Sequence, residues 1–210
     1  MNQELQRIEL YKQLNPNELS AQQFLKLMDE IKKPKSKTIS DEYFDFKLWY
    51  KGYQSRQESF ANFLAKKIPS GAKILEVGCG RTARLSRFLS QKGFYMTCID
   101  PKLEVVSGEH VEFIKETFDY KKFDLSPYDY IIGQEPCDAT EHIVRACINQ
   151  NKPFMITLCG VPHKLNSGKT PKDVYEWYNY LVDINSKDIK LRYISLDPFS
   201  DTPMLKSNQF

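Results

Sequence analysis

Apolar and polar positions alternate in two different ways along the chain from residue 70 onward. Short apolar runs of strand length lie at 72–78, 94–100, 111–116, 128–133 and 154–159. Segments with apolar residues at helical spacing lie at 82–93, 139–150 and 171–184, the last with Pro171 at an early position. Strands that alternate with helices predict a parallel sheet covered by helices on both faces.

The end of the chain has the pattern of a hairpin. Segments 190–197 and 203–210 flank a short tip with turn-forming residues, and no helical pattern separates them. The hairpin therefore adds one antiparallel strand at or near the edge of the sheet. The expected fold class is α/β, with a seven-stranded mostly parallel sheet, helices on both faces, a terminal antiparallel hairpin and an N-terminal helical extension.

The first part of the chain is predicted to be a separate extension. Segment 15–31 carries apolar residues on one helical face, and the basic segment 32–41 has the composition of a linker. Residues 1–44 are therefore assigned to an N-terminal helical extension and linker, and residues 45–210 to the main domain.

The main domain is expected to begin with helices. Segment 41–68 holds two helical stretches, and Phe60, Phe63 and Leu64 recur at the spacing of one helix face. The second stretch should therefore pack one side onto the sheet.

Composition narrows the class of protein. The 210 residues are 41% hydrophobic and 27% charged, which is typical of a folded domain. No apolar run approaches the roughly 20 residues that span a bilayer, and the N-terminus lacks a secretory signal, so we expect a cytoplasmic protein without a membrane partner. The net charge of +3 is too small to indicate nucleic acid binding by itself.

The five cysteines are irregularly spaced and include no Cys-x-x-Cys pair. This spacing is typical of a reducing compartment. It disfavours a disulfide framework and a structural zinc site, and no metal site is predicted.

The most informative segment joins the first apolar run to its helix. Glu76-Val77-Gly78-Cys79-Gly80 ends the strand with two glycines, which allow a sharp turn and close approach of a ligand. Asp100 ends the next strand, about 20 residues further on, where a carboxylate can bind ribose hydroxyls. The arrangement predicts a nucleotide-type cofactor.

These residues resemble the class I S-adenosyl-L-methionine (SAM)-dependent methyltransferases, and the resemblance covers about residues 45–210. It implies that Glu76, Gly78, Cys79 and Gly80 surround the methionine part of SAM and that Asp100 binds the ribose. The pyrophosphate cradle of a longer glycine motif is unnecessary, because SAM has no phosphate. Thr82 stands where the family has a third glycine.

The resemblance implies further cofactor contacts. Pro101 and Phe118 are expected against the adenine, and Thr117 occupies the position where the family often has an acid. Arg56 is expected to meet the SAM carboxylate, and Gln134, at the end of the fourth strand, is also assigned to the cofactor. The alternative for the segment around Arg56 is a helix that only covers the sheet.

The fourth strand is expected to end beside the transferred methyl group. Glu135, Asp138 and His142 are the candidate catalytic residues there, because a carboxylate or an imidazole can align a nucleophile and remove its proton. The alternative is structural: Asp138 or Thr140 would cap the following helix.

Pro136-Cys137 also resembles the cytosine-C5 methyltransferases of nucleic acids, in which a cysteine adds to the base. RNA members of that class use a second cysteine after the fifth strand, where Cys159 lies, but Gly160 follows it here in place of proline. No target-recognition domain fits into the chain, and buried structural cysteines are the commoner case.

The sequence therefore predicts a SAM-dependent methyltransferase, with a small-molecule acceptor favoured. A nucleic acid or protein acceptor stays open. The alternatives are a non-catalytic SAM- or nucleotide-binding module and a cytosine-C5 methyltransferase that uses Cys137.

Overall fold

The computed structural model of the chain describes residues 54–104, 108–197 and 201–210. Two compact units divide the chain, Met1–Ser59 and Phe60–Phe210. The helix and linker expected before residue 44, and the predicted domain boundary there, lie outside the described residues. None of the helices in the described part is long and apolar enough to cross a membrane.

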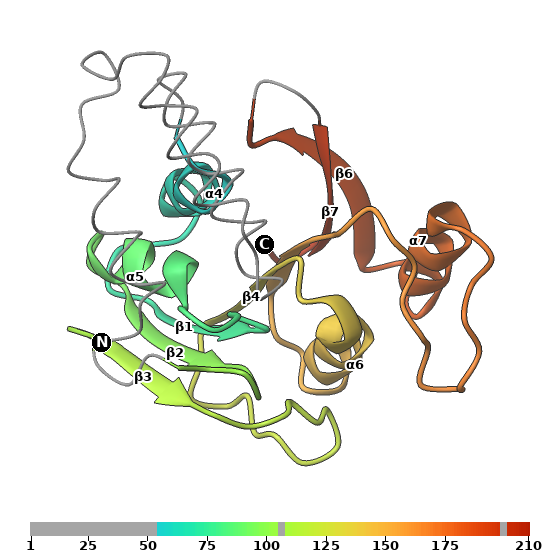
Figure 1. The fold of residues 1–210 in the computed structure, drawn as a ribbon, viewed down its shortest axis with the longest axis horizontal. Helices are drawn as coiled ribbons and strands as arrows, with labels where there is room; N and C mark the ends of the chain where they lie inside the picture. Colours follow the sequence, from blue (N-terminus) through green and yellow to red (C-terminus); the bar gives the residue numbers. More distant parts are fainter. Residues whose placement is uncertain (1–53, 105–107, 198–200) are drawn as a thin grey trace, which may run out of the picture. The chain divides into compact units, whose positions relative to one another are not determined.

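Seven strands form one sheet among the described residues, in the order β3-β2-β1-β4-β5-β7-β6 (Figure 1). Their bounds are β1 Lys73–Val77, β2 Tyr95–Ile99, β3 Val111–Ile114, β4 Tyr130–Gln134, β5 Phe154–Thr157, β6 Ile189–Ser195 and β7 Asp201–Ser207. The pairs among β1 to β5 are parallel, and β7 is antiparallel to both β5 and β6. The predicted fold class is confirmed, with the single antiparallel strand next to the edge.

The helices that accompany the sheet are short. Their bounds are α4 Arg56–Ala65, α5 Arg84–Ser90, α6 Thr140–Asn149 and α7 Val174–Asp183, with a 3₁₀ turn, η2 Cys137–Ala139, before α6. The buried residues of each helix show which of its sides packs on the sheet.

Successive residues of β1 belong to two different apolar clusters, one on each face of the sheet, because the side chains of a strand alternate between its faces. Ile74 belongs to a buried cluster with Phe60 and Leu64 of α4 and with Leu85 of α5. Leu75 belongs to the other cluster, which takes in Ile143 of α6 and Trp177 of α7. Helices therefore cover both faces of the sheet, as the apolar runs predicted (Figure 1).

The order of strands reverses at β1. The chain passes from β1 to β2 and β3 on one side and then returns to place β4 on the other side of β1. In sheets of this kind, ligands bind at the carboxyl ends of the strands where the order reverses. The loops that follow β1, β2 and β4 are therefore expected to form a ligand-binding site.

Helix α7 begins later than its sequence pattern indicates. Asp173 is its N-cap, and one carboxylate oxygen accepts hydrogen bonds from the backbone N–H groups of Tyr175 and Glu176, at 2.9 and 2.8 Å. The prediction that Pro171 lies early in the helix is wrong, because the side chain of Asp173 satisfies the first N–H groups two residues later.

Candidate functional site

The loop after β1 combines a tight contact with an open position. Gly78 and Gly80 both have positive φ angles, +74° and +69°. A Cβ atom on Gly78 would lie 2.6 Å from the Cβ of Pro136, whereas a Cβ on Gly80 would meet nothing within 4 Å. The backbone is therefore packed at the first glycine and open to a ligand at the second.

Asp100 connects this loop to the end of β2. Its Oδ2 accepts a hydrogen bond from the N–H of Gly80 at 3.0 Å, and its Oδ1 accepts one from the N–H of Lys102 at 2.7 Å. The residue is half-buried. Each carboxylate oxygen can accept more than one hydrogen bond, so Asp100 retains acceptor capacity for hydroxyl groups of a ligand.

Glu76 lies behind the loop. Its side chain is 2% exposed, and Oε2 accepts hydrogen bonds from the Ser86 N–H at 2.9 Å and the Ser86 hydroxyl at 2.5 Å. Burial raises the pKa of Glu76 to about 7, although the bonds from Ser86 act in the opposite direction. Glu76 thus holds α5 against β1 and positions the loop, and its direct contact with a cofactor stays a prediction.

The remaining residues assigned to the cofactor differ in exposure. Cys79 and Phe118 are buried in apolar clusters, with the Phe118 ring 5.1 Å from the ring of Phe123. Pro101 and Thr117 are exposed. The structure therefore places Phe118 in the core, where its ring has little surface to offer an adenine, and leaves Pro101 and Thr117 at the surface.

The neighbouring ends of β4 and β5 carry unsatisfied polar atoms. Gln134 Oε1 and Thr157 Oγ1 are buried and have no hydrogen-bond partner among the described residues. The two residues are register partners in the sheet. Because an unpaired buried polar atom is costly, these atoms mark a place where a ligand or water completes the hydrogen bonding.

Arg56 opens helix α4 and falls in the amino-terminal of the two compact units. Its contact with the SAM carboxylate stays a prediction.

The turn after β4 is strained on both sides of a buried proline. Glu135 and Cys137 adopt left-handed conformations, with φ of 52° and 54°, and Pro136 lies between them. Such conformations are unfavourable for residues with a Cβ, and they persist where packing enforces them. Here the close contact of Pro136 with Gly78 supplies that packing.

Three metal-ligating side chains meet beside this turn. The sulfur atoms of Cys137 and Cys159 and a ring nitrogen of His163 all lie within 4.8 Å of one another. Cys159 Sγ and His163 Nε2 are 3.0 Å apart, and His163 Nδ1 lies 2.9 Å from Asp138 Oδ1. Cys137 follows β4 and Cys159 follows β5, so the pairing of these two strands brings the cysteines together.

This geometry corrects the structural interpretation of Asp138 and Thr140. Helix α6 has Ala139 as its N-cap, without a side-chain capping bond. Asp138 contacts His163 instead, and Thr140 Oγ1 is buried without a partner in the part of the chain that the structure describes. The sequence pattern assigned no role to His163, although its position four residues after Cys159 is a spacing that metal ligands often show.

The two thiols of the cluster have shifted acidities. The neighbouring Cys137 thiol lowers the pKa of Cys159 to about 5, with smaller contributions from Val161 and His163. The neighbouring Cys159 and burial raise the pKa of Cys137. Both shifts arise mainly from the proximity of the two thiols.

Glu141 holds the loop that carries the cluster. It is 4% exposed and accepts hydrogen bonds from Arg145 Nε, the Tyr180 hydroxyl and the Asn166 N–H, at 2.7, 2.8 and 2.8 Å. Burial alone would raise the pKa of Glu141, but these hydrogen bonds together lower it. The carboxylate thus ties α6 to α7 and to the loop after β5.

The three predicted catalytic residues have different surroundings. Asp138 contacts His163, whereas the His142 ring meets the edge of the Tyr120 ring at 5.3 Å. His142 Nδ1 is buried and has no hydrogen-bond partner among the described residues. Glu135 occupies the strained turn and is half-buried. Their catalytic roles stay predictions.

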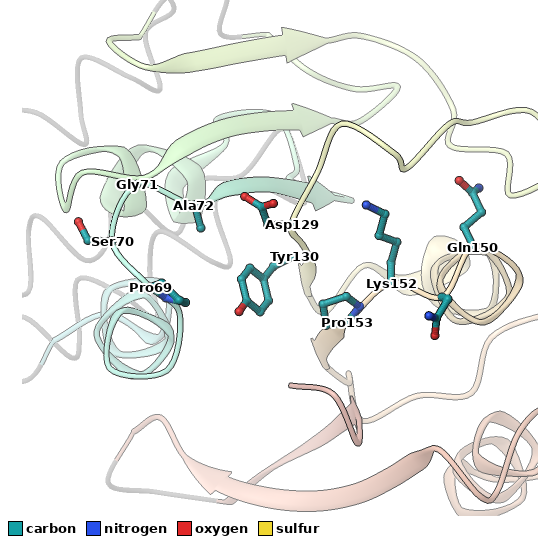
Figure 2. A pocket seen from close by; sticks show the side chains of 10 residues that line it. Pro69, Ser70, Gly71, Ala72, Asp129, Tyr130, Gln150, Lys152 and Pro153 are labelled. Carbon is teal, nitrogen blue, oxygen red and sulfur yellow. The ribbon is translucent and has the colours of Figure 1, made fainter.

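A separate hollow of about 750 Å³ lies at the amino ends of β1, β4 and β5, away from the loops that follow these strands (Figure 2). Asp129 and Lys152 line it, but Asp129 accepts a hydrogen bond from the Lys73 N–H, and the Lys152 ammonium donates to the Ser126 and Tyr128 carbonyls. These groups stabilise the amino ends of the strands. Since ligands of such sheets bind at the carboxyl ends, this hollow is not the candidate cofactor site.

Comparison with known proteins identifies the fold. The chain is similar to magnesium protoporphyrin IX methyltransferase from Synechocystis PCC 6803, solved with bound SAM, at 14% identity over 78% of this chain and 83% of that one, with a TM-score of 0.52. It is also similar to a SAM-dependent methyltransferase from Leishmania major, at 15% identity over 96% of this chain and 81% of that one, with a TM-score of 0.50. No family model and no curated protein sequence matches the chain.

The described domain therefore has the fold of the class I SAM-dependent methyltransferases. At these identities, the likeness defines the fold, and the activity has to be argued from the site.

Proposed function

We propose that the protein is a SAM-dependent methyltransferase that acts on a small molecule. The observation that carries this proposal is the joint placement of Gly80 and Asp100: an open backbone position, hydrogen-bonded to a half-buried carboxylate at the carboxyl ends of β1 and β2. This is where the fold binds its ligands.

The residues present suit this cofactor. The backbone around Gly80 would hold the methionine part, Asp100 would accept hydrogen bonds from the ribose hydroxyls, and Pro101 would contact the adenine. The unpartnered Gln134 Oε1 would accept a hydrogen bond from a polar group of the ligand. SAM would supply a methyl group on a positively charged sulfur, and the protein's part is to align the acceptor and exclude water.

A small acceptor is supported by two observations. The fold neighbour from Synechocystis is named for a small-molecule substrate, magnesium protoporphyrin IX. The net charge of +3 also gives the chain little general attraction for a nucleic acid. Glu135, Asp138 and His142 are the proposed groups for orienting or deprotonating that acceptor.

The cytosine-C5 alternative is less well supported. It requires Cys137 as a nucleophilic thiolate, whereas the Cys137 thiol donates to the Glu135 carbonyl at 3.2 Å, and the neighbouring Cys159 and burial raise its pKa. A raised pKa lowers the fraction of thiolate that could attack a base.

Calorimetric titration of the full chain with SAM tests the proposal. Wild-type protein should bind SAM, and Asp100→Ala should weaken binding about tenfold or more, since hydrogen bonds to a charged group contribute about 1.5–3 kcal/mol. Asp129→Ala is the matched control. The carboxylate of Asp129 also accepts a backbone hydrogen bond, from Lys73, but it lies at the amino ends of the strands, away from the candidate cofactor loop. Absence of binding to wild type, or equal loss in both variants, would contradict the proposal.

Transfer of a labelled methyl group from SAM into a small-molecule extract then separates an enzyme from a binding module. Label should appear in a low-molecular-weight product only when active protein is present. Tight SAM binding without transfer to any extract would instead identify the non-catalytic module.

A further inference from the structure

The cluster at the ends of β4 and β5 has the composition and geometry of a zinc site. We propose that Cys137, Cys159 and His163 bind one Zn²⁺ ion and leave its fourth coordination position to water or to a donor atom of a ligand. The proposal does not require SAM to be bound, although the site adjoins the candidate cofactor loop through Pro136.

The distances agree with tetrahedral coordination. Zinc binds sulfur at about 2.3 Å and imidazole nitrogen at about 2.0–2.1 Å, so two ligand atoms of a tetrahedral site lie about 3.5–3.8 Å apart. The three donor atoms here lie within 4.8 Å of one another, and the closest pair, Cys159 Sγ and His163 Nε2, is 3.0 Å apart. Changes of about 1 Å or less in these separations would therefore convert the cluster into a zinc centre.

Asp138 orients the histidine for this role. Its Oδ1 lies 2.9 Å from His163 Nδ1, which places the proton on Nδ1 and directs the Nε2 lone pair toward the sulfur atoms. A carboxylate that accepts a hydrogen bond from a metal-bound histidine is a common feature of zinc sites, and it makes the imidazole a better ligand.

The loop that carries Cys159 and His163 is held from several sides. The Tyr178 hydroxyl donates to the Cys159 carbonyl at 2.9 Å, and the Asn166 N–H donates to Glu141 Oε2 at 2.8 Å. The His163 ring also packs on Trp177, with 5.1 Å between ring centroids. These contacts position the ligands before a metal binds, which reduces the ordering that binding requires.

Cys137 is held by a different element. It follows Pro136, which packs against Gly78, and its own left-handed backbone turns the side chain toward the cluster. The ligands therefore come from two strand ends, one of which packs on the candidate cofactor loop. The absence of a Cys-x-x-Cys pair, which disfavoured zinc in the sequence, does not bear on a site built in this way.

The types of donor atom in the cluster favour zinc over magnesium and calcium. Two sulfur atoms and one imidazole suit zinc, whereas magnesium and calcium prefer oxygen ligands. Two thiolates also balance the double positive charge of Zn²⁺. Three protein ligands with one open position are typical of catalytic rather than structural zinc sites.

Cobalt substitution provides a direct test, without SAM. The reduced, metal-free full chain is titrated with Co²⁺, which gives tetrahedral ligand-field bands and thiolate-to-cobalt charge-transfer absorption when sulfur binds. We expect saturation at one Co²⁺ per chain and loss of these bands when Zn²⁺ is added. Absence of the charge-transfer band would overturn the proposal.

Variants assign the ligands. Cys137→Ser, Cys159→Ser and His163→Ala should each remove high-affinity zinc binding, and Asp138→Ala should weaken it about 10- to 100-fold. Cys147→Ala and His110→Ala, which change residues outside the cluster, should bind as wild type does. Zinc affinity that is unchanged in the Cys137 and Cys159 variants would overturn the assignment.

A measurement on wild-type protein covers the case in which a variant fails to fold. Zn²⁺ should protect Cys137 and Cys159 from alkylation mapped by mass spectrometry, whereas the three buried cysteines should react slowly with or without the ion. If instead reduced protein shows no protection and mild oxidation joins Cys137 to Cys159, the cluster is a redox-active pair and the zinc proposal is wrong. Because SAM is absent throughout, these outcomes are independent of the proposed methyltransferase activity.

Discussion

Gly78 and Pro136 are packed so closely that a Cβ atom on the glycine would lie 2.6 Å from the Cβ of the proline. This contact joins the loop after β1, where the cofactor is proposed to bind, to the turn after β4, which carries Cys137. The candidate cofactor site and the proposed zinc site therefore share a packed boundary, and a change at Gly78 should affect both.

Alanine at the two loop glycines should have different effects. Gly78→Ala should lower the free energy of unfolding by about 2–5 kcal/mol, since a left-handed alanine costs about 1–2 kcal/mol and the overlap with Pro136 adds about 1–3 kcal/mol. Gly80→Ala should cost only the left-handed term, about 1–2 kcal/mol, because its Cβ meets open space.

Urea unfolding and SAM titration of both variants check this prediction. Gly80→Ala should weaken SAM binding more than its loss of stability suggests, because the methyl group occupies the proposed ligand position. Equal losses of stability in the two variants would show that the contact with Pro136 relaxes without cost.

Glu76 should make stability depend on pH. Its pKa in the folded protein, about 7, lies above the ordinary value of 4.5, so the folded state holds its proton more tightly than the unfolded state does. The contribution of Glu76 to the free energy of unfolding is fully present below pH 4.5. It is lost as pH rises through 7, by about 3 kcal/mol in total.

Glu76→Gln should remove this dependence, because the amide carries no titrating proton. Unfolding measured at several values of pH should show the variant gaining stability relative to wild type as pH rises from 4.5 to 7. A constant difference between the two proteins would mean that Glu76 titrates alike in the folded and unfolded states.

Tyr180→Phe should loosen the loop after β5. The Tyr180 hydroxyl donates to Glu141 at 2.8 Å and accepts from Arg145 at 2.9 Å, so its removal should lower the free energy of unfolding by about 1–2 kcal/mol. Amide hydrogen exchange of residues 158–166 should become faster. Tyr175→Phe is the control on the same helix, since Tyr175 is 68% exposed, and it should change neither quantity.

Asp173→Ala should destabilise helix α7 by about 1 kcal/mol, because it removes the acceptor for the Tyr175 and Glu176 N–H groups. Thermal unfolding measures the effect. Asp183→Ala, at the carboxyl end of the same helix, should be neutral or slightly stabilising, because a negative charge there opposes the helix dipole. A larger loss at Asp183 than at Asp173 would contradict the assigned cap.

The elements that depend on local pattern were predictable. The inner parallel strands β1, β2, β4 and β5 are apolar runs, since both of their faces are covered, and the spacing of Phe60 and Leu64 correctly indicated the buried face of α4. The positions of Gly80 and Asp100 at neighbouring strand ends also followed from the sequence, because parallel strands end at the same edge. The carboxylate of Asp100 does bind the Gly80 N–H.

The directions of side chains could not be predicted in the same way. Phe118 is buried in the core, and its contact with an adenine stays a prediction; Asp138 contacts His163 and does not cap α6, so that interpretation was wrong. A side chain takes the partner that folding brings within reach, and for Asp138 that partner is 25 residues away in the sequence.

The sequence by itself determined the layered α/β fold and the glycine loop with its acid, because contiguous apolar runs and a strand–glycine–helix junction are local patterns. Only the tertiary structure decided that Cys137, Cys159 and His163 meet. The physical reason is the pairing of β4 with β5, which places the residues after both strands at one edge of the sheet, while Glu141 and Tyr178 hold the loop that returns His163 to it.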